Sequence, residues 1–499
     1  MNIQQVKIYS TLTLLLFGLS GCKKFLNVMP VGQTTIPVLF SDMDGIRSAI
    51  PGAYAKTYDY YTNHFYLYPE LAGDLLQADL QQLAEGRQNI YNYNSDPDQE
   101  AAPSAKIWSD ILASLANVNN ALFYLPSLEE KYPGSRNELA VYKAELLFLR
   151  ALGHFDLCRA YAQPYTYTTD ASHIGVPILS QTPGPDDVVT RQPVKEVYAF
   201  VLRDLKEADQ IYNDNRNDFR TAKQRPYFAS KEAVQALLSR VYLYMEDWDQ
   251  VIRYANEVIS ERQLARGGNY TSMYFDLAGP ETETIFRLNG QDKGSGLLSF
   301  FNFRNANDFV LPQAYPAEKF VGLFDEGTND LRINALLFKL ETNPGQSANF
   351  IGLTRKFDAV QTATDGNRQH MNPLVLRVSE IYLNRAEAYI GKKQAELAAA
   401  DVETIRARGL QTSGDDIILP ENDLDAMRNI VYEERIRELA FEGHRLFDIT
   451  RRKQNLVRNT NTNSTVKELT YPSDYFVLPI PQRELDANTG MKGNPTVNN

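Results

Sequence analysis

The sequence is poor in the side chains from which metal sites and most catalytic centres are built. Its 499 residues include only 5 His and 2 Cys. The histidines are scattered, with no H-E-x-x-H motif and no Cys/His cluster, which argues against a bound zinc ion. A G-x-S-x-G motif and a phosphate-cradling glycine loop are also absent. We therefore expect no catalytic residue, no cofactor and no metal site.

Two carboxylate pairs, Asp186-Asp187 and Asp415-Asp416, could imitate the acid–base pair of a hydrolase. The two carboxyl groups of a glycoside hydrolase face each other across the substrate, and adjacent residues on one segment do not. Solvated turns are the better interpretation of both pairs.

Positive charge is also in deficit. The chain has 51 Lys and Arg against 62 Asp and Glu, which gives a net charge of −11. A protein that binds nucleic acid shows a basic surface, so this balance argues against that function. Hydrophobic residues at 43% and charged residues at 23% are typical of a globular chain. The 29 Tyr and 24 Phe could fill a core or stack on sugar rings, and composition does not decide between these uses.

The first 22 residues have the pattern of an export signal. Lys7 supplies positive charge, and the apolar run Leu12–Leu19 is too short to span a bilayer. Leu19-Ser20-Gly21-Cys22 then matches the lipobox of bacterial lipoproteins. We expect residues 1–21 to be a lipoprotein signal peptide and Cys22 to become the lipidated first residue. A cleaved secretory signal with a chance cysteine is the alternative.

A highly charged segment, Asn429–Arg452, is interrupted only by Gly443, and we predict a single long helix there. Opposite charges lie three or four residues apart, so they are neighbours on a helix surface. They also stand among large apolar side chains and cannot all be solvated. Because buried ions need partners, we predict a structural ion-pair network where several helices meet. Its expected members are Glu434, Arg437, Glu438, Glu442, Arg445 and Asp448.

Two segments share one spacing of small and aromatic residues. The shared offsets fall at Ser239, Tyr242, Val251, Ala255 and Val258, and again at Ala386, Tyr389, Ala398, Val402 and Ile405. A small side chain lets two helices approach and the aromatic ring fills the gap above, as in tetratricopeptide repeats. We predict a mostly all-α fold, a tetratricopeptide-like scaffold of helix pairs with little β structure. Residues 85–105 and 266–371 are expected to be long irregular loops, the usual place for binding, with one short strand at residues 284–288.

The charged segment resembles a family signature. It follows the E-R-R-R-E-L-x-F-E-G-x-R-x-x-D-L-x-R pattern of the SusD/RagB family of outer-membrane lipoproteins at Glu434, Arg435, Arg437, Glu438, Leu439, Phe441, Glu442, Gly443, Arg445, Asp448 and Arg451. Residues 138–161 resemble a second family helix, and Pro479-Ile480-Pro481 with Asn494-Pro495 resembles the family's ending, although Thr496 replaces its Gly. The likeness covers nearly all of the chain after the signal. It implies an N-terminal region over residues 22–230 and a C-terminal region over residues 231–499 of one compact fold.

The resemblance implies a non-catalytic lipoprotein that is anchored in the outer membrane and exposed at the cell surface. It would bind a nutrient, usually an oligosaccharide, and sit as a lid on a SusC-like TonB-dependent transporter. Aromatic rings in loops suit the C–H face of a sugar, and neighbouring Asn, Arg and Asp suit its hydroxyls. The expected ligand contacts are Tyr91, Tyr93, Trp108, Phe301, Arg304 and Tyr315.

The pair Tyr91 and Tyr93 is the most specific of these expectations, because its spacing in a polar stretch has no core periodicity to explain it. Three other functions stay open. A peptide-binding member of the same family would keep the fold and change the ligand. A glycoside hydrolase would need paired carboxylates in one cleft, and a purely structural helical scaffold would bind no small ligand.

Overall fold

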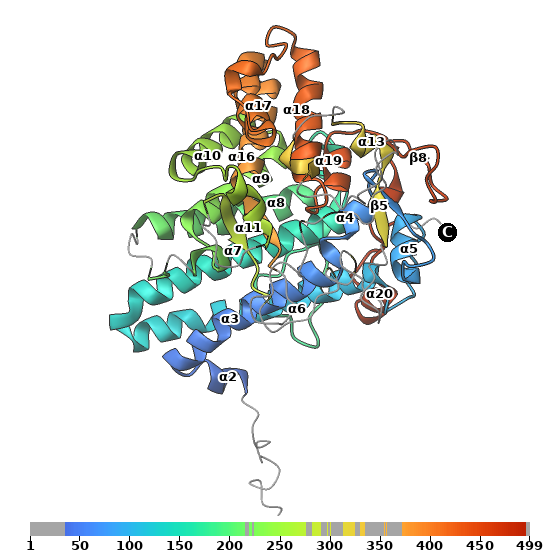
Figure 1. Ribbon diagram of the computed structural model, residues 1–499. Helices are drawn as coiled ribbons and strands as arrows, with labels where there is room; N and C mark the ends of the chain where they lie inside the picture. Colours follow the sequence, from blue (N-terminus) through green and yellow to red (C-terminus); the bar gives the residue numbers. More distant parts are fainter. Residues whose placement is uncertain are drawn as a thin grey trace, which may run out of the picture.

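The computed structural model is mainly helical (Figure 1). It describes residues 35–214, 219–221, 224–275, 282–290, 297, 300, 313–324, 330–334, 354, 356 and 372–495. Within these ranges helices dominate and strands are few and short, which confirms the predicted fold class. None of the helices in the described ranges is both long and apolar enough to cross a membrane.

The helices divide between two stretches of the chain. The first stretch holds α2 (Ile36–Leu39), α3 (Met43–Tyr60), the π-helix η1 (Tyr61–Phe65), α4 (Tyr68–Leu71), α5 (Glu85–Tyr91), α6 (Pro103–Lys131), α7 (Arg136–Tyr161) and α8 (Val194–Asp214). The second holds α9 (Lys231–Met245), α10 (Trp248–Glu261), α11 (Gly268–Phe275), α13 (Glu318–Val321), α14 (Leu331–Asn334), α16 (Val378–Gly391), α17 (Ala395–Leu410), α18 (Leu424–Leu439), α19 (Arg445–Arg451) and α20 (Gln482–Ala487). Single 3-10 turns connect some of them at η2 (Pro133–Ser135), η3 (Tyr165–Tyr167), η4 (Arg225–Tyr227), η5 (Gly414–Asp416) and η6 (Asp474–Phe476).

The long helices pack in order along the chain. Helix α3 packs on α6, α6 on α7, α7 on α8 and α8 on α9, and the stack continues through α10, α16, α17 and α18 (Figure 1). Helix α7 is buried on all sides from Ala144 to Tyr161, which is why its apolar residues show no single stripe. One hydrophobic core extends from Phe40 near the start of the described chain to Met491 near its end.

The predicted helix pairs are present as α9 with α10 and α16 with α17. The small residues Ser239 and Ala386 are fully buried at the helix contacts. Gly391 at the end of α16 lies so close to Trp248 of α10 that a Cβ there would come within 2.4 Å of the indole ring. The tetratricopeptide-like spacing in the sequence therefore corresponds to packed helix pairs in the structure.

The strands form four separate antiparallel pairs in the described chain. These are β1 (Leu76–Ala78) with β5 (Ala314–Pro316), β2 (Ile174–Pro177) with β3 (Arg191–Pro193), β4 (Thr284–Arg287) with β6 (Leu374–Arg377), and β7 (Leu456–Val457) with β8 (Glu468–Leu469). The predicted strand at residues 284–288 is β4, and it pairs with the strand that leads directly into α16.

Two segments predicted as irregular contain helix. Helix α5 lies inside the expected loop over residues 85–105, and α11, α13 and α14 lie inside residues 266–371. Helix α5 has too few turns to show a stripe in the sequence. It is held by its last two side chains, Ile90 and Tyr91, which are buried in the core. Tertiary packing stabilises such short helices, so sequence periodicity does not reveal them.

The single long helix predicted over Asn429–Arg452 is wrong. Helix α18 ends at Leu439, the chain turns through residues 440–444, and α19 begins at Arg445. Phe441 and Gly443 adopt left-handed backbone conformations, with φ of 67° and 82°. At Gly443 this conformation is easy because the residue has no Cβ. The division between residues 22–230 and 231–499 stays a prediction.

Candidate ligand-binding site

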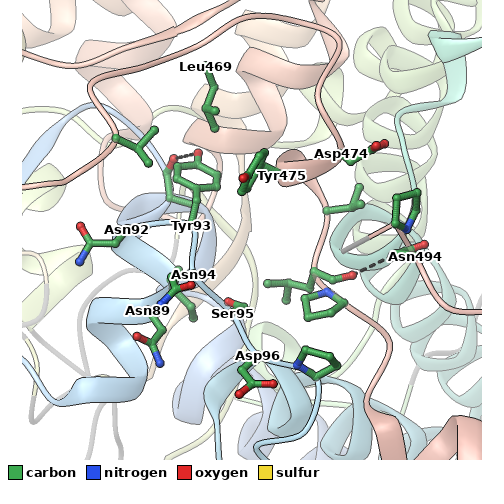
Figure 2. A pocket seen from close by; sticks show the side chains of 18 of the residues that line it. Asn89, Asn92, Tyr93, Asn94, Ser95, Asp96, Leu469, Asp474, Tyr475 and Asn494 are labelled. Carbon is green, nitrogen blue, oxygen red and sulfur yellow. Dashed lines mark hydrogen bonds between the residues drawn. The ribbon is translucent and has the colours of Figure 1, made fainter. Parts of the chain in front are cut away.

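A cavity of about 960 Å³ opens between two segments that are far apart in sequence (Figure 2). One wall is the polar stretch 89–98, which begins in the last turn of α5, and the opposite wall is formed by residues 465–469, 474–482 and 493–495. The volume falls in the range of natural small-molecule sites. A backbone hydrogen bond from Gln482 N–H to the Pro97 carbonyl, 3.0 Å long, joins the two walls at one edge.

Arg458, which follows β7, fixes the base of these walls. Its guanidinium donates to the carbonyl oxygens of Leu71, Gly73 and Tyr91 at 2.7–3.0 Å. It also lies over the rings of Tyr91 and Tyr93, 4.4 and 5.4 Å from their centroids. Burial lowers the pKa of Arg458, while the nearby tyrosines oppose that change. One side chain thus holds α4, the start of the polar stretch and the β7–β8 hairpin together.

Three described tyrosines line the cavity: Tyr68 is buried, and the rings of Tyr93 and Tyr475 are more exposed. Tyr93 is half-buried in a left-handed conformation with φ of 55°, its hydroxyl donates to the Ala72 carbonyl, and its ring meets Phe476 edge-on. Tyr475, in η6, is also half-buried, and Figure 2 shows it beside Tyr93 at one side of the cavity. Burial raises the pKa of Tyr93, so its phenol is neutral at physiological pH. Together Tyr93 and Tyr475 offer ring surface to a ligand from two different segments.

The carboxamides around the cavity divide into structural and available groups. Asn92 accepts from the Thr465 N–H at 3.1 Å, and Asn494 donates to the carbonyls of Tyr161 and Leu478 at 2.8 and 2.7 Å. Asn89 and Asn94 also line the cavity, and their side chains form no hydrogen bond with another described residue. Because a carboxamide is both donor and acceptor, these two suit hydroxyl groups of a ligand.

Among the predicted ligand contacts in the described part of the chain, Tyr93 is the one that lines this cavity. The expectation of accessible rings at Tyr91 and Trp108 is wrong, since their exposed fractions are 0% and 1%. Tyr91 hydroxyl bonds to Thr462 at 2.7 Å, and Trp108 packs edge-on against Tyr161 with centroids 4.9 Å apart. Both rings belong to the core, and neither can stack on a ligand.

The remaining predicted contacts lie elsewhere. Tyr315 is half-buried in β5, opposite Gln77 of β1, and does not line the cavity. Phe301, Arg304 and Cys22 lie outside the described residues. Tyr475 was missed by the sequence analysis. The only signal for it is an aromatic cluster, Tyr471 with Tyr475 and Phe476, in a turn-rich stretch ahead of the Pro-rich tail.

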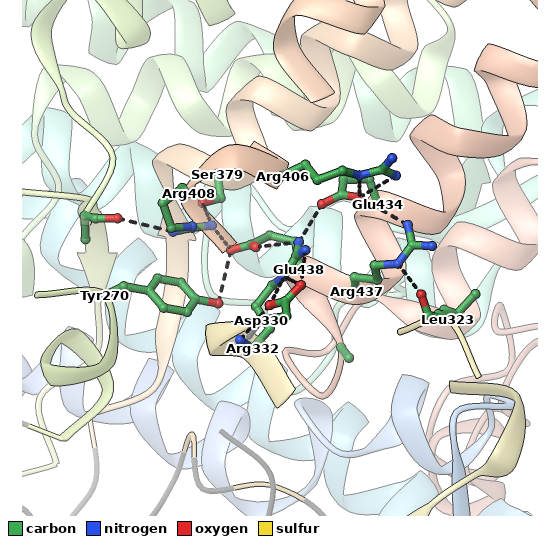
Figure 3. Close-up of polar contacts among 12 residues, drawn as sticks. Tyr270, Leu323, Asp330, Arg332, Ser379, Arg406, Arg408, Glu434, Arg437 and Glu438 are labelled. Atoms are coloured by element: carbon green, nitrogen blue, oxygen red, sulfur yellow. Dashed lines mark hydrogen bonds and ion pairs between the residues drawn. The ribbon is translucent and has the colours of Figure 1, made fainter. Parts of the chain in front are cut away.

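The predicted ion-pair network is a buried structural cluster separate from the cavity (Figure 3). Glu438 lies at its centre, with Arg408 and Arg377 each 2.6 Å away and Arg332 at 3.5 Å. Glu434 pairs with Arg332 at 2.5 Å and with Arg437 at 3.1 Å, and Glu442 pairs with Arg377 at 2.7 Å. Although burial opposes it, these arginines hold the pKa of Glu438 well below its usual range.

Arg445 and Asp448 pair mainly with residues outside their own helix. Arg445 pairs with Asp74 at 2.5 Å, and Asp448 pairs with Arg435 and Arg451 at 2.7 and 2.8 Å. The break after α18 separates Arg445 from Glu442, because these two residues no longer share a helix surface, whereas Asp448 and Arg451 pair within α19. Five of the six predicted members are buried and Arg437 is partly buried; all six form ion pairs, and most of their partners come from other elements.

Among the described residues, no group of three or more His, Cys, Asp or Glu side chains is placed to hold a metal ion.

Comparisons with known proteins agree with this architecture. Residues 324–496 match the family described as "SusD family", and residues 32–243 match "Starch-binding associating with outer membrane". SusD-like protein P2 of Formosa agariphila is 24% identical over 97% of this chain and 98% of its own length. SusD-like protein P25 of the same organism is 21% identical over 100% of this chain and 99% of its own length.

Solved structures share the fold. A SusD superfamily protein from Bacteroides thetaiotaomicron superposes with a TM-score of 0.76 at 23% identity, covering 91% of this chain and 100% of that one. A putative sugar binding protein from Bacteroides vulgatus superposes with a TM-score of 0.75 at 23% identity, covering 91% of this chain and 98% of that one.

Proposed function

Because the chain belongs to the SusD/RagB family, whose members are non-catalytic binding proteins, we propose that it binds an oligosaccharide in the cavity between residues 89–98 and 465–495. It would do so at the outer membrane, held by a lipid on Cys22, and deliver the ligand to a SusC-like TonB-dependent transporter. The description of the N-terminal family match and the sugar-binding description of a structural relative support this proposal.

The observation that carries the proposal is the pairing of ring surface with available carboxamides in one cavity. Tyr93 and Tyr475 offer apolar faces for the C–H face of a pyranose, while Asn89 and Asn94 offer donors and acceptors for its hydroxyls. Pyranoses are amphipathic in the same way, with apolar faces and polar edges. A cavity of about 960 Å³ has room for several such units.

Replacing Tyr475 with alanine is expected to weaken oligosaccharide binding by roughly 1–3 kcal/mol. This magnitude is taken from alanine substitutions of aromatic residues that stack on nucleobases. Stability should change little, because the ring is half-exposed in a short turn. A glycan array on the purified protein would first identify a ligand, and isothermal titration would then measure the affinity of wild type and variant.

A matched control is Tyr167→Ala. Tyr167 is an exposed tyrosine in another 3-10 turn and does not line the cavity, so its loss should leave affinity unchanged. Equal affinities of wild type and Tyr475→Ala, in a stably folded protein, would exclude this cavity as the binding site. Binding of peptides and not glycans in the same assays would replace the proposal with the peptide-binding alternative.

Anchoring is tested at Cys22. Cys22→Ala should move the protein from the membrane fraction to the soluble fraction and remove the mass of the lipid, because the sequence motif Leu19-Ser20-Gly21-Cys22 would lose its acceptor. One acyl chain holds a protein only marginally, so the wild type is expected to carry several. Unchanged fractionation, with no lipid mass on Cys22 in the wild type, would exclude the lipoprotein assignment.

A further inference from the structure

The charged side chains around the cavity are mainly acidic. Among the described residues that line it, Asp96, Asp98, Glu468 and Asp474 are acidic and Lys467 alone is basic. None of these four carboxylates forms an ion pair with a residue in the described part of the chain. Their charge is therefore not neutralised by close partners and acts on whatever enters the cavity.

The same charge sign continues next to the cavity. A second hollow of about 420 Å³ shares Asp98 and Gln482 with the first, and it adds Glu100, Asp486 and Arg483 to the lining. Counted over both hollows, six carboxylates face two cations. An extended ligand that leaves the first cavity on this side passes along acidic side chains only partly balanced by Arg483, which lies 3.9 Å from Glu100.

The nearby cations do little to offset these carboxylates at the ligand. Lys467 is exposed and donates one hydrogen bond to the Thr460 carbonyl at 3.1 Å, so it is one cation against four carboxylates. Arg458 is buried behind the rings of Tyr91 and Tyr93, and the donor atoms for which hydrogen bonds are described point to main-chain carbonyls and to Ser464. Arg458 therefore presents no open guanidinium fork to an anionic sugar.

From this charge distribution we infer that the cavity selects oligosaccharides that are uncharged or carry amino groups, and rejects those built from uronic acid or sulfated units. The inference rests on the proposed function. Exposed charges interact over about one Debye length, roughly 8 Å at physiological ionic strength. A single carboxylate therefore repels an anionic ligand only weakly. The repulsion becomes substantial when several carboxylates act on a ligand that carries one charge per sugar unit, because the pairwise energies sum. Asp96, Glu468 and Asp474 are the specificity-determining residues.

The test compares one sugar skeleton in two charge states. The glycan identified on the array is compared with the same oligosaccharide oxidised at C6 to its uronate form, by titration of the full-length mature protein in 20 mM and 500 mM NaCl. These concentrations are chosen from the salt dependence of exposed charges. The uronate form should bind at least roughly tenfold more weakly in low salt, and the difference should shrink to a few-fold in high salt.

The triple variant Asp96→Asn/Glu468→Gln/Asp474→Asn should largely remove this difference in low salt. The substitutions keep the shape of the side chains. In the wild type the Asp96 carboxylate accepts a hydrogen bond from the Asp98 N–H at 2.9 Å, and the amide oxygen of Asp96→Asn can accept the same bond. The control Asp44→Asn/Glu130→Gln/Asp425→Asn makes the same change in net charge at exposed positions that do not line either hollow. It should retain the wild-type discrimination.

The outcomes separate this inference from the proposed function. If the wild type binds a uronate or sulfated glycan best, the charge selectivity is wrong while oligosaccharide binding stands. If both triple variants change the discrimination equally, overall charge and not the cavity lining is responsible, and the assignment of the three residues is overturned. If no glycan of any charge class binds, the proposed function itself fails.

Discussion

Glu438→Ala is expected to destabilise the protein by roughly 3–5 kcal/mol or more, enough to lower the denaturation midpoint strongly or abolish soluble expression. Glu438 is fully buried and faces Arg332, Arg377 and Arg408, each nearly or fully buried as well. Removing its single negative charge leaves three guanidinium groups in a low-dielectric interior with too few counter-charges. The penalty comes from those uncompensated cations and not from the loss of one attraction.

Guanidinium denaturation followed by far-UV circular dichroism measures this effect. Glu438→Gln keeps the side-chain shape and one carbonyl oxygen for the surrounding donors. We expect its denaturation midpoint to lie between those of Glu438→Ala and the wild type, and this variant provides the measurement if the alanine variant does not fold. Glu433→Ala is the matched control on the same helix. Its carboxylate is 46% exposed and pairs with Arg437 at 3.2 Å, an arrangement worth about 0.5 kcal/mol or less. A wild-type midpoint for Glu438→Ala would show that the cluster does not stabilise the fold.

The free energy of unfolding is expected to fall steeply as the pH drops from about 4.5 to about 2. Although burial opposes it, the charges of their arginine and lysine partners hold the pKa values of Asp74, Glu380 and Glu387 at about 2. In the unfolded chain these groups bind protons near pH 4, so the unfolded state takes up protons first as the pH falls. Each group then loses about 2.5–3.5 kcal/mol of stabilisation, at about 1.4 kcal/mol per pKa unit.

Between pH 7 and 4.5 the expected change is smaller because two effects oppose each other. Burial lowers the pKa of His154 to about 4 and that of His444 to about 3, so their contribution to stability is present above about pH 6.5 and is lost as the pH falls. The Leu179 N–H donates to Nε2 of His154 at 2.9 Å, which requires that nitrogen to be unprotonated. Burial raises the pKa of Glu70 to about 7, against four backbone N–H groups that lower it, so Glu70 favours folding increasingly as the pH falls toward 4.5.

Urea denaturation at pH 7.5, 6, 5, 4 and 3 in one buffer series checks this profile. The exposed-charge control Asp44→Asn should give the same pH dependence as the wild type, because Asp44 has a side chain that is 93% exposed. Equal free energies of unfolding at pH 7.5 and pH 3 would contradict buried, ionised carboxylates as a source of stability in this fold.

The helix pairs and the ion-pair cluster could be predicted from the sequence because each leaves a local mark. The spacing of Ser239 and Tyr242 recurs at Ala386 and Tyr389, and it reflects how closely neighbouring helices approach. The charges of residues 434–448 stand among apolar side chains, so burial and pairing follow from the cost of an isolated buried ion. The partners of those charges could not be predicted in the same way, because Arg377 and Arg408 lie in other elements.

The break after α18 was decided by a distant residue. Glu70, in α4, accepts hydrogen bonds from the backbone N–H groups of Phe441, Gly443, His444 and Arg445. Those donors would be bonded within the helix if it continued, so the buried carboxylate stabilises the turn instead. A single Gly443 in an otherwise helical pattern gave too weak a signal, because one glycine costs a helix only about 1 kcal/mol.

By itself, the sequence determined the mostly helical class, the helix pairing, the burial of a charged segment and, through its motifs, the resemblance to a family. These follow from periodicity, from the cost of burying charge and from residue patterns within one segment. Only the tertiary structure decided which aromatic rings reach a ligand. Tyr91 and Tyr93 are two residues apart in one polar stretch, yet Tyr91 is buried under Arg458 and Tyr93 lines the cavity beside Tyr475. Exposure depends on packing between segments nearly 400 residues apart, and no local pattern records it.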